Sequence, residues 1–131
     1  VYTDLGIYYP KTGGIEQDFV SVKAYAAVFR ALYNASYLNQ IHSNEILSFM
    51  SKSGFKSGIV NGVPNDVLVS NKFGERVFYD SKNTQISELH DCGIIYKKDN
   101  PYILCIMTKG DDLNKLTKII SDISEMVYKE H

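Results

Sequence analysis

The sequence predicts an α+β fold in which helices pack on an antiparallel three-stranded sheet. Two segments near the start of the chain and one at its end carry apolar residues at helical spacing. Between them, runs rich in β-branched and apolar residues predict three strands: Val67–Phe73, Cys92–Tyr96 and Tyr102–Thr108. The short polar segment Lys97–Asn100 joins the last two strands and predicts a tight hairpin. Because a hairpin makes neighbouring strands antiparallel, the sheet is predicted to be antiparallel.

Each predicted helix has a start signal. The capping residues are Ser21, Ser43 and the pair Asp111–Asp112. The first helix is expected to run to about Tyr37, and the second, with Glu45 in its first turn, to end at Ser53-Gly54, followed by a loop over residues 55–65. The apolar faces are Val22, Tyr25, Phe29, Leu32 and Tyr33 in the first helix, Ile46, Leu47 and Met50 in the second, and Leu113, Leu116, Ile120, Ile123 and Val127 in the last.

Composition limits the classes of function. The chain has 131 residues, 44% of them hydrophobic, which predicts a single domain over residues 1–131. The formal net charge is -1 and no block of like charge occurs, so no nucleic-acid or anionic-membrane partner is expected. The longest apolar run, Tyr102–Met107, is too short to span a bilayer. No cofactor is expected. Because the chain begins at Val1 without a methionine, we expect it to be a processed product or a piece of a longer protein.

The two cysteines fall on the predicted hairpin. If Tyr96 pairs with Pro101, Cys92 lies directly opposite Cys105 on one face of the sheet. The favoured interpretation is a pair of buried free thiols that act as small hydrophobes. A cross-strand disulfide is the alternative.

The strand Tyr102–Thr108 is apolar at odd and even positions alike, so both of its faces are expected to be buried. It is also expected at one edge of the sheet. A long apolar edge strand invites pairing, and natural proteins cover or charge such strands. We therefore expect other strands, from residues that precede Val1, to lie against it.

Three blocks of sequence carry a resemblance to a known family. They are "VPNDVLVSNKFGER", "ELHDCGIIYKKDNPYILCIMTKGDD" with the amphipathic helix after it, and "SVKAYAAVFRALYNASYLNQIHSNEILSFMSKSGF" upstream. Their order and spacing resemble the C-terminal portion of the class A β-lactamase and penicillin-recognising serine hydrolase family, from about Ser21 to the end. In that family a strand ends in Lys-Thr-Gly, a Gly-Ile-Ile or Gly-Ile-Val hairpin strand follows, and a helix packs back on the sheet. The resemblance implies the C-terminal part of a β-lactamase-like α/β sandwich.

The resemblance implies roles for three residues of the "NKFGER" segment. Lys72 would line the cleft, polarise groups around the nucleophile and attract the substrate carboxylate. Gly74 would let a substrate backbone lie flat along the strand, and the N–H of Glu75 would supply one oxyanion-hole donor. The alternative is structural: a solvated strand lysine, a strand-ending glycine and a solvated turn pair, Glu75-Arg76.

One position departs from the family. Its middle Thr or Ser gives a hydroxyl to the substrate carboxylate, whereas Phe73 has no hydrogen-bonding group. Strand alternation predicts that Phe73 points away from Lys72, into the core on the other face. Penicillin-type specificity is therefore not implied at this position.

His90 and Asp91 open the strand next to that of Lys72, and antiparallel pairing is expected to bring them near the site. His90 would relay protons or hold a substrate group, and a plain polar strand end is the alternative. A thiol nucleophile at Cys92, or a metal site of His90, Cys92 and Cys105, is disfavoured because no orienting residue or fourth ligand is visible. No metal is expected.

Other matches to family motifs are interpreted as accidental. Lys11-Thr12-Gly13 precedes the helices and has the composition of a turn. Ser53 and Lys56 have the Ser-x-x-Lys spacing but follow a helix, whereas the family's serine begins one. Tyr37-Leu38-Asn39 resembles the family's second motif, Ser-x-Asn or Tyr-x-Asn, but follows the first helix, later in the chain than that motif should occur.

The chain thus has a Lys-x-Gly segment in place of the family's third motif, Lys-Thr-Gly. It lacks the first two motifs, which are the Ser-x-x-Lys of the nucleophile and the Ser-x-Asn or Tyr-x-Asn element. The sequence predicts the C-terminal part of a serine hydrolase that acts on β-lactam or cell-wall peptide amide bonds through an acyl-enzyme. The nucleophile would come from the missing N-terminal part of the same protein, so this chain alone is expected to be inactive. The family implies an extracytoplasmic location. The alternative is a non-catalytic binding module that pairs with a peptide or partner chain along the exposed strand.

Overall fold

A computed structural model describes residues 3–5, 7 and 20–131. The element order is η1 (Thr3–Leu5), α1 (Val22–Tyr33), α2 (Gln40–Met50), η2 (Ile59–Gly62), β1 (Val69–Tyr79), β2 (Gln85–Ile95), β3 (Tyr102–Gly110) and α3 (Leu113–Glu130). The rejected Lys11-Thr12-Gly13 motif lies outside the described residues. Among the described residues, no helix is both long and apolar enough to cross a membrane.

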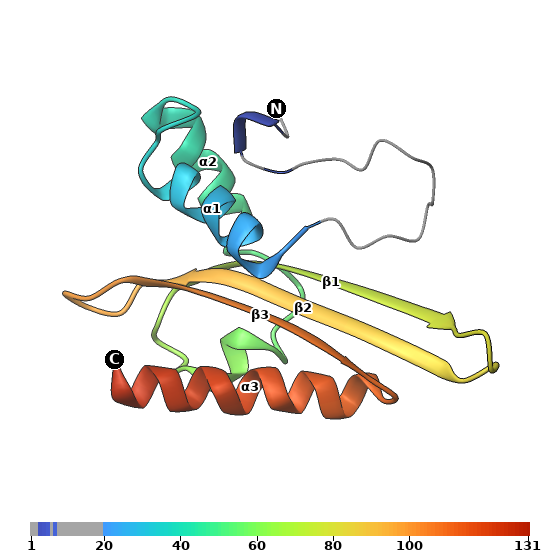
Figure 1. The fold of residues 1–131 in the computed structure, drawn as a ribbon. Coiled ribbons are helices and arrows are strands. Elements are labelled where there is room, and N and C mark those ends of the chain that lie inside the picture. The colour runs from blue at the N-terminus through green and yellow to red at the C-terminus, as the bar shows by residue number, and fades with distance from the viewer. Residues whose placement is uncertain (1–2, 6, 8–19) are drawn as a thin grey trace.

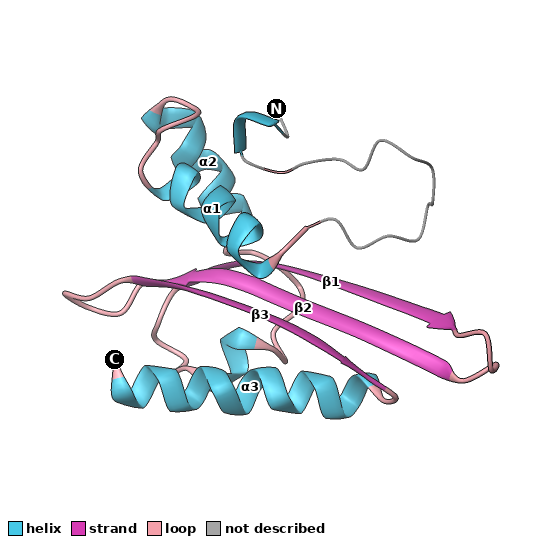
Figure 2. Ribbon diagram, viewed as in Figure 1, coloured by secondary structure: helices cyan, strands magenta, loops and turns pink. Residues whose placement is uncertain are grey.

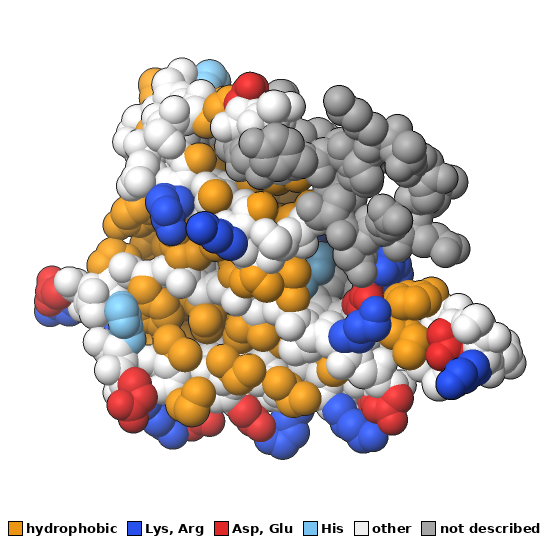
Figure 3. Space-filling model, viewed as in Figure 1, with side chains coloured by type: hydrophobic (Ala, Val, Ile, Leu, Met, Phe, Trp, Pro, Cys, Tyr) orange, Lys and Arg blue, Asp and Glu red, His pale blue; other side chains and the backbone are white. Residues whose placement is uncertain are grey.

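The three strands form one antiparallel sheet in the order β1-β2-β3 (Figures 1 and 2). Helices α1 and α2 lie on one face of the sheet, and α3 with η2 lies on the other (Figure 1). This arrangement confirms the predicted α+β class with a three-stranded antiparallel sheet. β3 is an edge strand, as predicted, and hydrophobic side chains gather around it on the surface in Figure 3.

Strands β1 and β2 are longer than the sequence patterns predicted. Val67–Phe73 was expected for β1, and the strand continues to Tyr79; β2 begins at Gln85 instead of Cys92. The added residues pair with each other down to Tyr79 opposite Gln85. The tip of this hairpin, over residues 78–86, projects beyond the end of β3 (Figure 1). Period-two apolar alternation was too weak there to reveal a strand, because much of this hairpin faces solvent.

Two of the three predicted helix starts are confirmed. The side chain of Ser21 accepts a hydrogen bond from the N–H of Ala24, and Asp112 caps α3. The prediction for α2 was wrong: Asn39 is its N-cap, with Oδ1 accepting from the N–H of His42 at 2.9 Å. Ser43 is instead fully buried inside α2, one turn after the true start. α1 also ends at Tyr33, earlier than expected.

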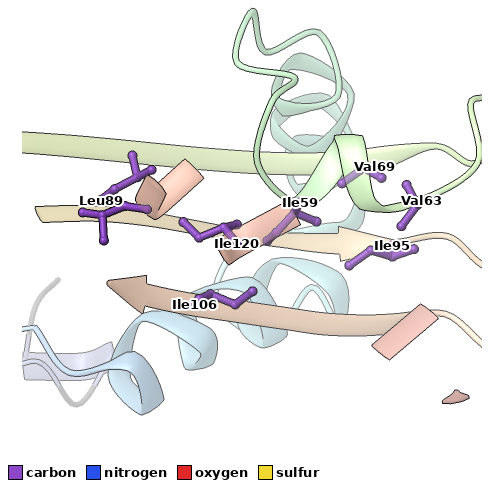
Figure 4. Packing of buried hydrophobic residues seen from close by; sticks show 8 residues of the cluster. Ile59, Val63, Val69, Leu89, Ile95, Ile106 and Ile120 are labelled. Atoms are coloured by element: carbon purple, nitrogen blue, oxygen red, sulfur yellow. The ribbon is translucent and has the colours of Figure 1, made fainter. Parts of the chain in front are cut away.

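The larger hydrophobic core lies between the sheet and α3. Figure 4 labels seven of its side chains, which come from all three strands, α3 and the η2 segment: Ile59, Val63, Val69, Leu89, Ile95, Ile106 and Ile120. The hydroxyl of Ser124 donates to the buried carbonyl of Ile59 at 2.8 Å, which fixes η2 against α3. Residues 55–65, predicted to be a loop, therefore contain a short 3-10 helix that belongs to the core.

The second core lies on the other face, beneath α1 and α2. Its buried residues are Phe29, Leu47, Cys92 and Ile94. Cys92 and Cys105 lie opposite each other, which confirms the predicted hairpin register. They form a disulfide bond, so the interpretation as free thiols was wrong. At the turn, the N–H of Asn100 donates to the carbonyl of Lys97, so these two residues form a hydrogen-bonded pair. Because hydrogen-bonded and non-hydrogen-bonded pairs alternate along an antiparallel ladder, Cys92 and Cys105 form a non-hydrogen-bonded pair, the kind in which side chains are closest.

Candidate active site

Hydrogen bonding in the β1–β2 ladder decides which backbone groups of β1 face outward. The N–H of Tyr96 donates to Leu68, and that of Asp80 to Thr84, both at 3.0 Å. Because bonded and non-bonded pairs alternate along an antiparallel ladder, the even-numbered residues of β1 bond to β2. The N–H and C=O groups of the odd-numbered residues, Phe73 and Glu75 among them, therefore point away from the sheet.

Lys72 reaches this outer edge. Its side chain is exposed, and its Nζ donates a hydrogen bond to the outward-facing carbonyl of Phe73. The ammonium group therefore lies at the edge of β1 where the N–H of Glu75 also points outward. An extended chain laid along this edge would meet the ammonium group of Lys72 and the outward-facing N–H of Glu75.

Phe73 points to the opposite face, as strand alternation predicted. Its ring stacks on that of Phe55, with 4.3 Å between the centroids, and packs against the core under α3. Phe73 is therefore a core residue. The edge of β1 has no side-chain hydroxyl at this position.

Gly74 is paired with His90 of β2, and the imidazole lies over the glycine. A Cβ atom at position 74 would lie 2.4 Å from Cε1 and 2.7 Å from Nε2 of His90. The ring is also held edge-on by Tyr25 of α1, with 5.3 Å between the centroids. Glycine at position 74 thus leaves room for the histidine ring, in addition to the role that the family resemblance implies. Pairing brings His90 beside Lys72 and Gly74, as expected.

The electrostatic setting of His90 favours its neutral form. Burial lowers the pKa of the imidazole, and the nearby charge of Lys72 lowers it further. Burial, with a smaller contribution from the charge of Asp91, raises the pKa of the Tyr25 phenol. A neutral imidazole has one acceptor and one donor nitrogen, so His90 is able to hold or pass a proton near neutral pH.

Asp91 is a buried residue whose role the sequence did not reveal. It lies on the α3 face, is fully buried, and accepts hydrogen bonds from the N–H of Ile59 at 2.9 Å and from Nδ2 of Asn71 at 3.0 Å. Burial raises the pKa of this carboxyl group, although both hydrogen bonds and the charge of Lys72 act in the opposite direction. Asp91 therefore fixes η2 to the sheet beneath the site. Its partners are distant in sequence, so no local pattern predicted them.

An ion cluster follows the site along the hairpin. Glu88 of β2 binds Arg76 of β1 at 2.7 Å and Lys109 of β3 at 2.8 Å. Burial alone would raise the pKa of Glu88, but the hydrogen bonds and charges of the two cations lower it overall. Both cations also lie over the ring of Phe78, at 4.7 Å for Arg76 and 5.3 Å for Lys109. The cluster ties the three strands together.

The two accidental motifs in the described residues have structural explanations. Ser53 follows the end of α2, and Nζ of Lys56 donates to the carbonyl of Ser51 at 3.2 Å. This arrangement differs from that of a serine at a helix start with a lysine one turn later. Asn39 of the Tyr37-Leu38-Asn39 match is the cap of α2.

The described part of the chain contains neither a cluster of metal-binding residues nor a free thiol. No group of three or more His, Cys, Asp or Glu residues there has the geometry to hold a metal ion. The disulfide occupies both cysteines, so neither is available as a nucleophile or ligand.

A three-stranded antiparallel sheet with helices on both faces is the arrangement of a β-lactamase-like domain. The model of the β-lactamase enzyme family matches residues 8–131. The chain belongs to this family, as the sequence motifs indicated.

Solved structures give the same fold. The TLA-1 extended-spectrum β-lactamase is similar with a TM-score of 0.78 and 17% identity, over 98% of this chain and 51% of that one. A class A β-lactamase from Bacteroides cellulosilyticus has a TM-score of 0.76 and 17% identity, over 98% and 50%. A mutant of PBP-A, solved as an acyl-enzyme complex with penicillin G, has a TM-score of 0.74 and 14% identity, over 98% and 48%. The chain spans about half the length of these proteins.

Proposed function

We propose that this chain is the C-terminal part of a serine hydrolase that cleaves β-lactam or cell-wall peptide amide bonds through an acyl-enzyme. The observation that carries the proposal is the outer edge of β1, where the Lys72 ammonium contacts the carbonyl of Phe73 close to the outward-facing N–H of Glu75. A mutant of PBP-A, a protein of similar fold, was solved as an acyl-enzyme complex with penicillin G. Residues 1–131 would form one partial domain, completed by the rest of the protein.

Each residue has a distinct task in this proposal. Lys72 attracts the substrate carboxylate and polarises groups around the nucleophile. The N–H of Glu75 donates to the oxyanion that forms when the serine attacks, and Gly74 leaves the strand surface flat for the substrate and for His90. His90, neutral near pH 7, accepts or passes a proton at the edge of the site.

The nucleophilic serine would lie in the part of the protein that precedes Val1, and its own N–H would be the second oxyanion donor. Strands from the same part would pair with the outer edge of β3, where hydrophobic side chains gather (Figure 3). The disulfide between Cys92 and Cys105 supports an extracytoplasmic location, because disulfides persist in oxidising compartments.

A non-catalytic binding module is the second candidate, and Phe73 favours it. Its ring is used in the core, so the hydroxyl that the family uses for the substrate carboxylate is missing from this strand. Such a module would bind a cell-wall peptide or a partner chain along the edge of β1 without forming a covalent adduct.

Labelling with a fluorescent penicillin separates the two candidates. The 131-residue chain would be compared with the same chain extended upstream to its natural start, and with the extended protein carrying Lys72→Ala. We expect label only on the extended protein, and a loss of labelling rate of about a hundredfold in the Lys72→Ala variant. A Lys72→Arg variant, which keeps the charge but not its compact shape, controls for charge alone. No label on the extended protein would favour the binding module, and an unchanged rate would remove Lys72 from the mechanism.

A further inference from the structure

We propose that His90 replaces the hydroxyl that Phe73 lacks and donates a hydrogen bond to the substrate carboxylate beside Lys72, and that Tyr25 of α1 positions its ring. This inference rests on the proposed function, which places the substrate carboxylate at the Lys72 ammonium. Because Phe73 is a core residue, the carboxylate would otherwise meet only that one cation on β1.

Glycine at position 74 lets the ring of His90 reach across β1. His90 belongs to the central strand β2, where it pairs with Gly74. The three atoms nearest to the position of a Cβ at residue 74 all belong to the imidazole: Nδ1 at 3.3 Å, Nε2 at 2.7 Å and Cε1 closer still. The ring therefore occupies the space that a side chain of β1 would fill. A residue of the inner strand thus comes close to the outer edge of the sheet.

Lys72 and His90 lie on the same face of the sheet. Lys72 pairs with Cys92, and Gly74 pairs with His90, so the two side chains are diagonal neighbours across the β1–β2 ladder. Diagonal neighbours lie about 7–8 Å apart, which long side chains can span. Burial lowers the pKa of the imidazole, and the charge of Lys72 lowers it further, in agreement with their closeness. A carboxylate beside Gly74 would therefore meet both groups.

The imidazole has a hydrogen-bond donor to offer. The side chain is half-buried, and no residue that the structure describes forms a hydrogen bond with it. A neutral imidazole has one N–H donor, and a protonated imidazole has two. The hydroxyl of Thr or Ser also has one donor. Neutral His90 is therefore able to supply the same kind of hydrogen bond from the neighbouring strand.

The charges around the ring favour an anion. The charged and titratable side chains near it in the described structure are those of Lys72, Arg76, Glu88, Asp91, Lys109 and Tyr25. Both carboxylates have other partners: Glu88 binds Arg76 and Lys109, and Asp91 lies on the opposite face, where it accepts from Ile59 and Asn71. A substrate carboxylate would therefore not compete with an acidic side chain for His90.

Tyr25 fixes the orientation of the imidazole from the side of α1. Its ring meets that of His90 edge-on, with 5.3 Å between the centroids and 88° between the planes. Tyr25 also packs edge-on against Phe29, at 5.7 Å, and Phe29 is fully buried in the core beneath α1. Contacts thus run from this core through Tyr25 to His90. The ring of Tyr25 makes these contacts, so phenylalanine is expected to serve in its place.

The test uses the full-length protein and two esters that share one acyl group. The leaving group ends in a carboxylate in one ester and in a carboxamide in the other. The measured quantity is the ratio of kcat/KM for the carboxylate ester to that for the carboxamide ester, which cancels any general change in activity. We expect this ratio to fall about tenfold in His90→Ala, as for the loss of a hydrogen bond to a charged group. His42→Ala, which changes an exposed histidine of α2, is the control and should leave the ratio unchanged.

The pH profile and the Tyr25 variants separate this role from a structural one. A bound carboxylate raises the pKa of His90, so the ratio should rise about fivefold between about pH 8 and pH 5 in the wild type. His90→Gln keeps an N–H donor that does not titrate, so its ratio should not vary with pH. Tyr25→Leu should lower the ratio about threefold, and Tyr25→Phe should preserve it. If Tyr25 were only structural, both rates would fall equally and the ratio would stay constant.

The outcomes separate this inference from the proposed function. If penicillin labels the protein but the ratio in His90→Ala equals that of the wild type, the role of His90 is refuted and the hydrolase stands. A ratio that falls in His90→Ala but not in Tyr25→Leu overturns the role of Tyr25. If neither penicillin nor either ester reacts, the hydrolase is refuted, and NMR titration of the His90 imidazole decides the binding role. A pKa that is raised by N-acetyl-D-alanyl-D-alanine but not by its amide supports carboxylate binding, and equal pKa values overturn it.

Discussion

Replacing Gly74 by alanine tests the packing of the candidate site most sharply. The new Cβ would lie 2.4 Å from Cε1 and 2.7 Å from Nε2 of His90. Nonbonded carbon atoms prefer about 3.5–4.0 Å, so the imidazole would have to move by about 1 Å. Tyr25 contacts the ring edge-on and limits that movement. Overpacking of this kind costs about 1–3 kcal/mol of unfolding free energy.

Without the histidine, the effect of Gly74→Ala on the unfolding free energy should reverse, from destabilising to stabilising. Position 74 is in an ordinary strand conformation, so alanine there lowers the entropy of the unfolded chain and stabilises by about 0.4–1 kcal/mol if space is available. In a His90→Ala background that space is present. The coupling between the two substitutions is therefore expected to be about 1.5–4 kcal/mol.

Urea unfolding of the full-length protein, followed by circular dichroism, measures all four corners of this double-mutant cycle. Equal effects of Gly74→Ala with and without His90 would refute the contact between the two residues. The slope of free energy against urea should stay constant across the variants, which shows that only stability has changed.

Three further predictions concern His90 and the residues around this pair. Asp91→Asn should destabilise the protein by about 1–3 kcal/mol in urea unfolding, because the two buried donors bind different carboxylate oxygens and the amide nitrogen that replaces one of them cannot accept; an unchanged midpoint would contradict this. The His90 imidazole should titrate below about 6.5 by NMR, so stability should fall as the pH drops below that value, and Lys72→Met should raise the pKa; no change would contradict the charge effect. Phe73→Thr, which restores the family's hydroxyl, should cost about 3–5 kcal/mol by removing the ring that stacks on Phe55; a neutral effect would exclude Phe73 from the core.

Local chemistry explains what the sequence predicted well. Ser21 and Asp112 cap helices through short-range hydrogen bonds, and strand alternation placed Phe73 in the core. The short turn after Tyr96 fixed the register of the second hairpin, and so the pairing of Cys92 with Cys105. Each of these features depends on residues a few positions apart.

Features that depend on distant residues were missed or misjudged. Asp91 looked like a polar strand end, but its partners come from η2 and β1. Ser43 has the chemistry of a cap, yet the packing of α2 buries it and leaves that role to Asn39. The bond between Cys92 and Cys105 was not favoured, because register alone does not distinguish a disulfide from two thiols.

Mass spectrometry of the full-length protein after reaction with penicillin tests the central claim most directly. The account predicts a covalent adduct of one penicillin per molecule, on a serine in the part of the protein that precedes Val1, and slower adduct formation when Lys72 is replaced by alanine. An adduct on Ser53 or on any other residue of the 131 would contradict the proposed division of the site. The absence of any adduct would contradict the acyl-enzyme itself.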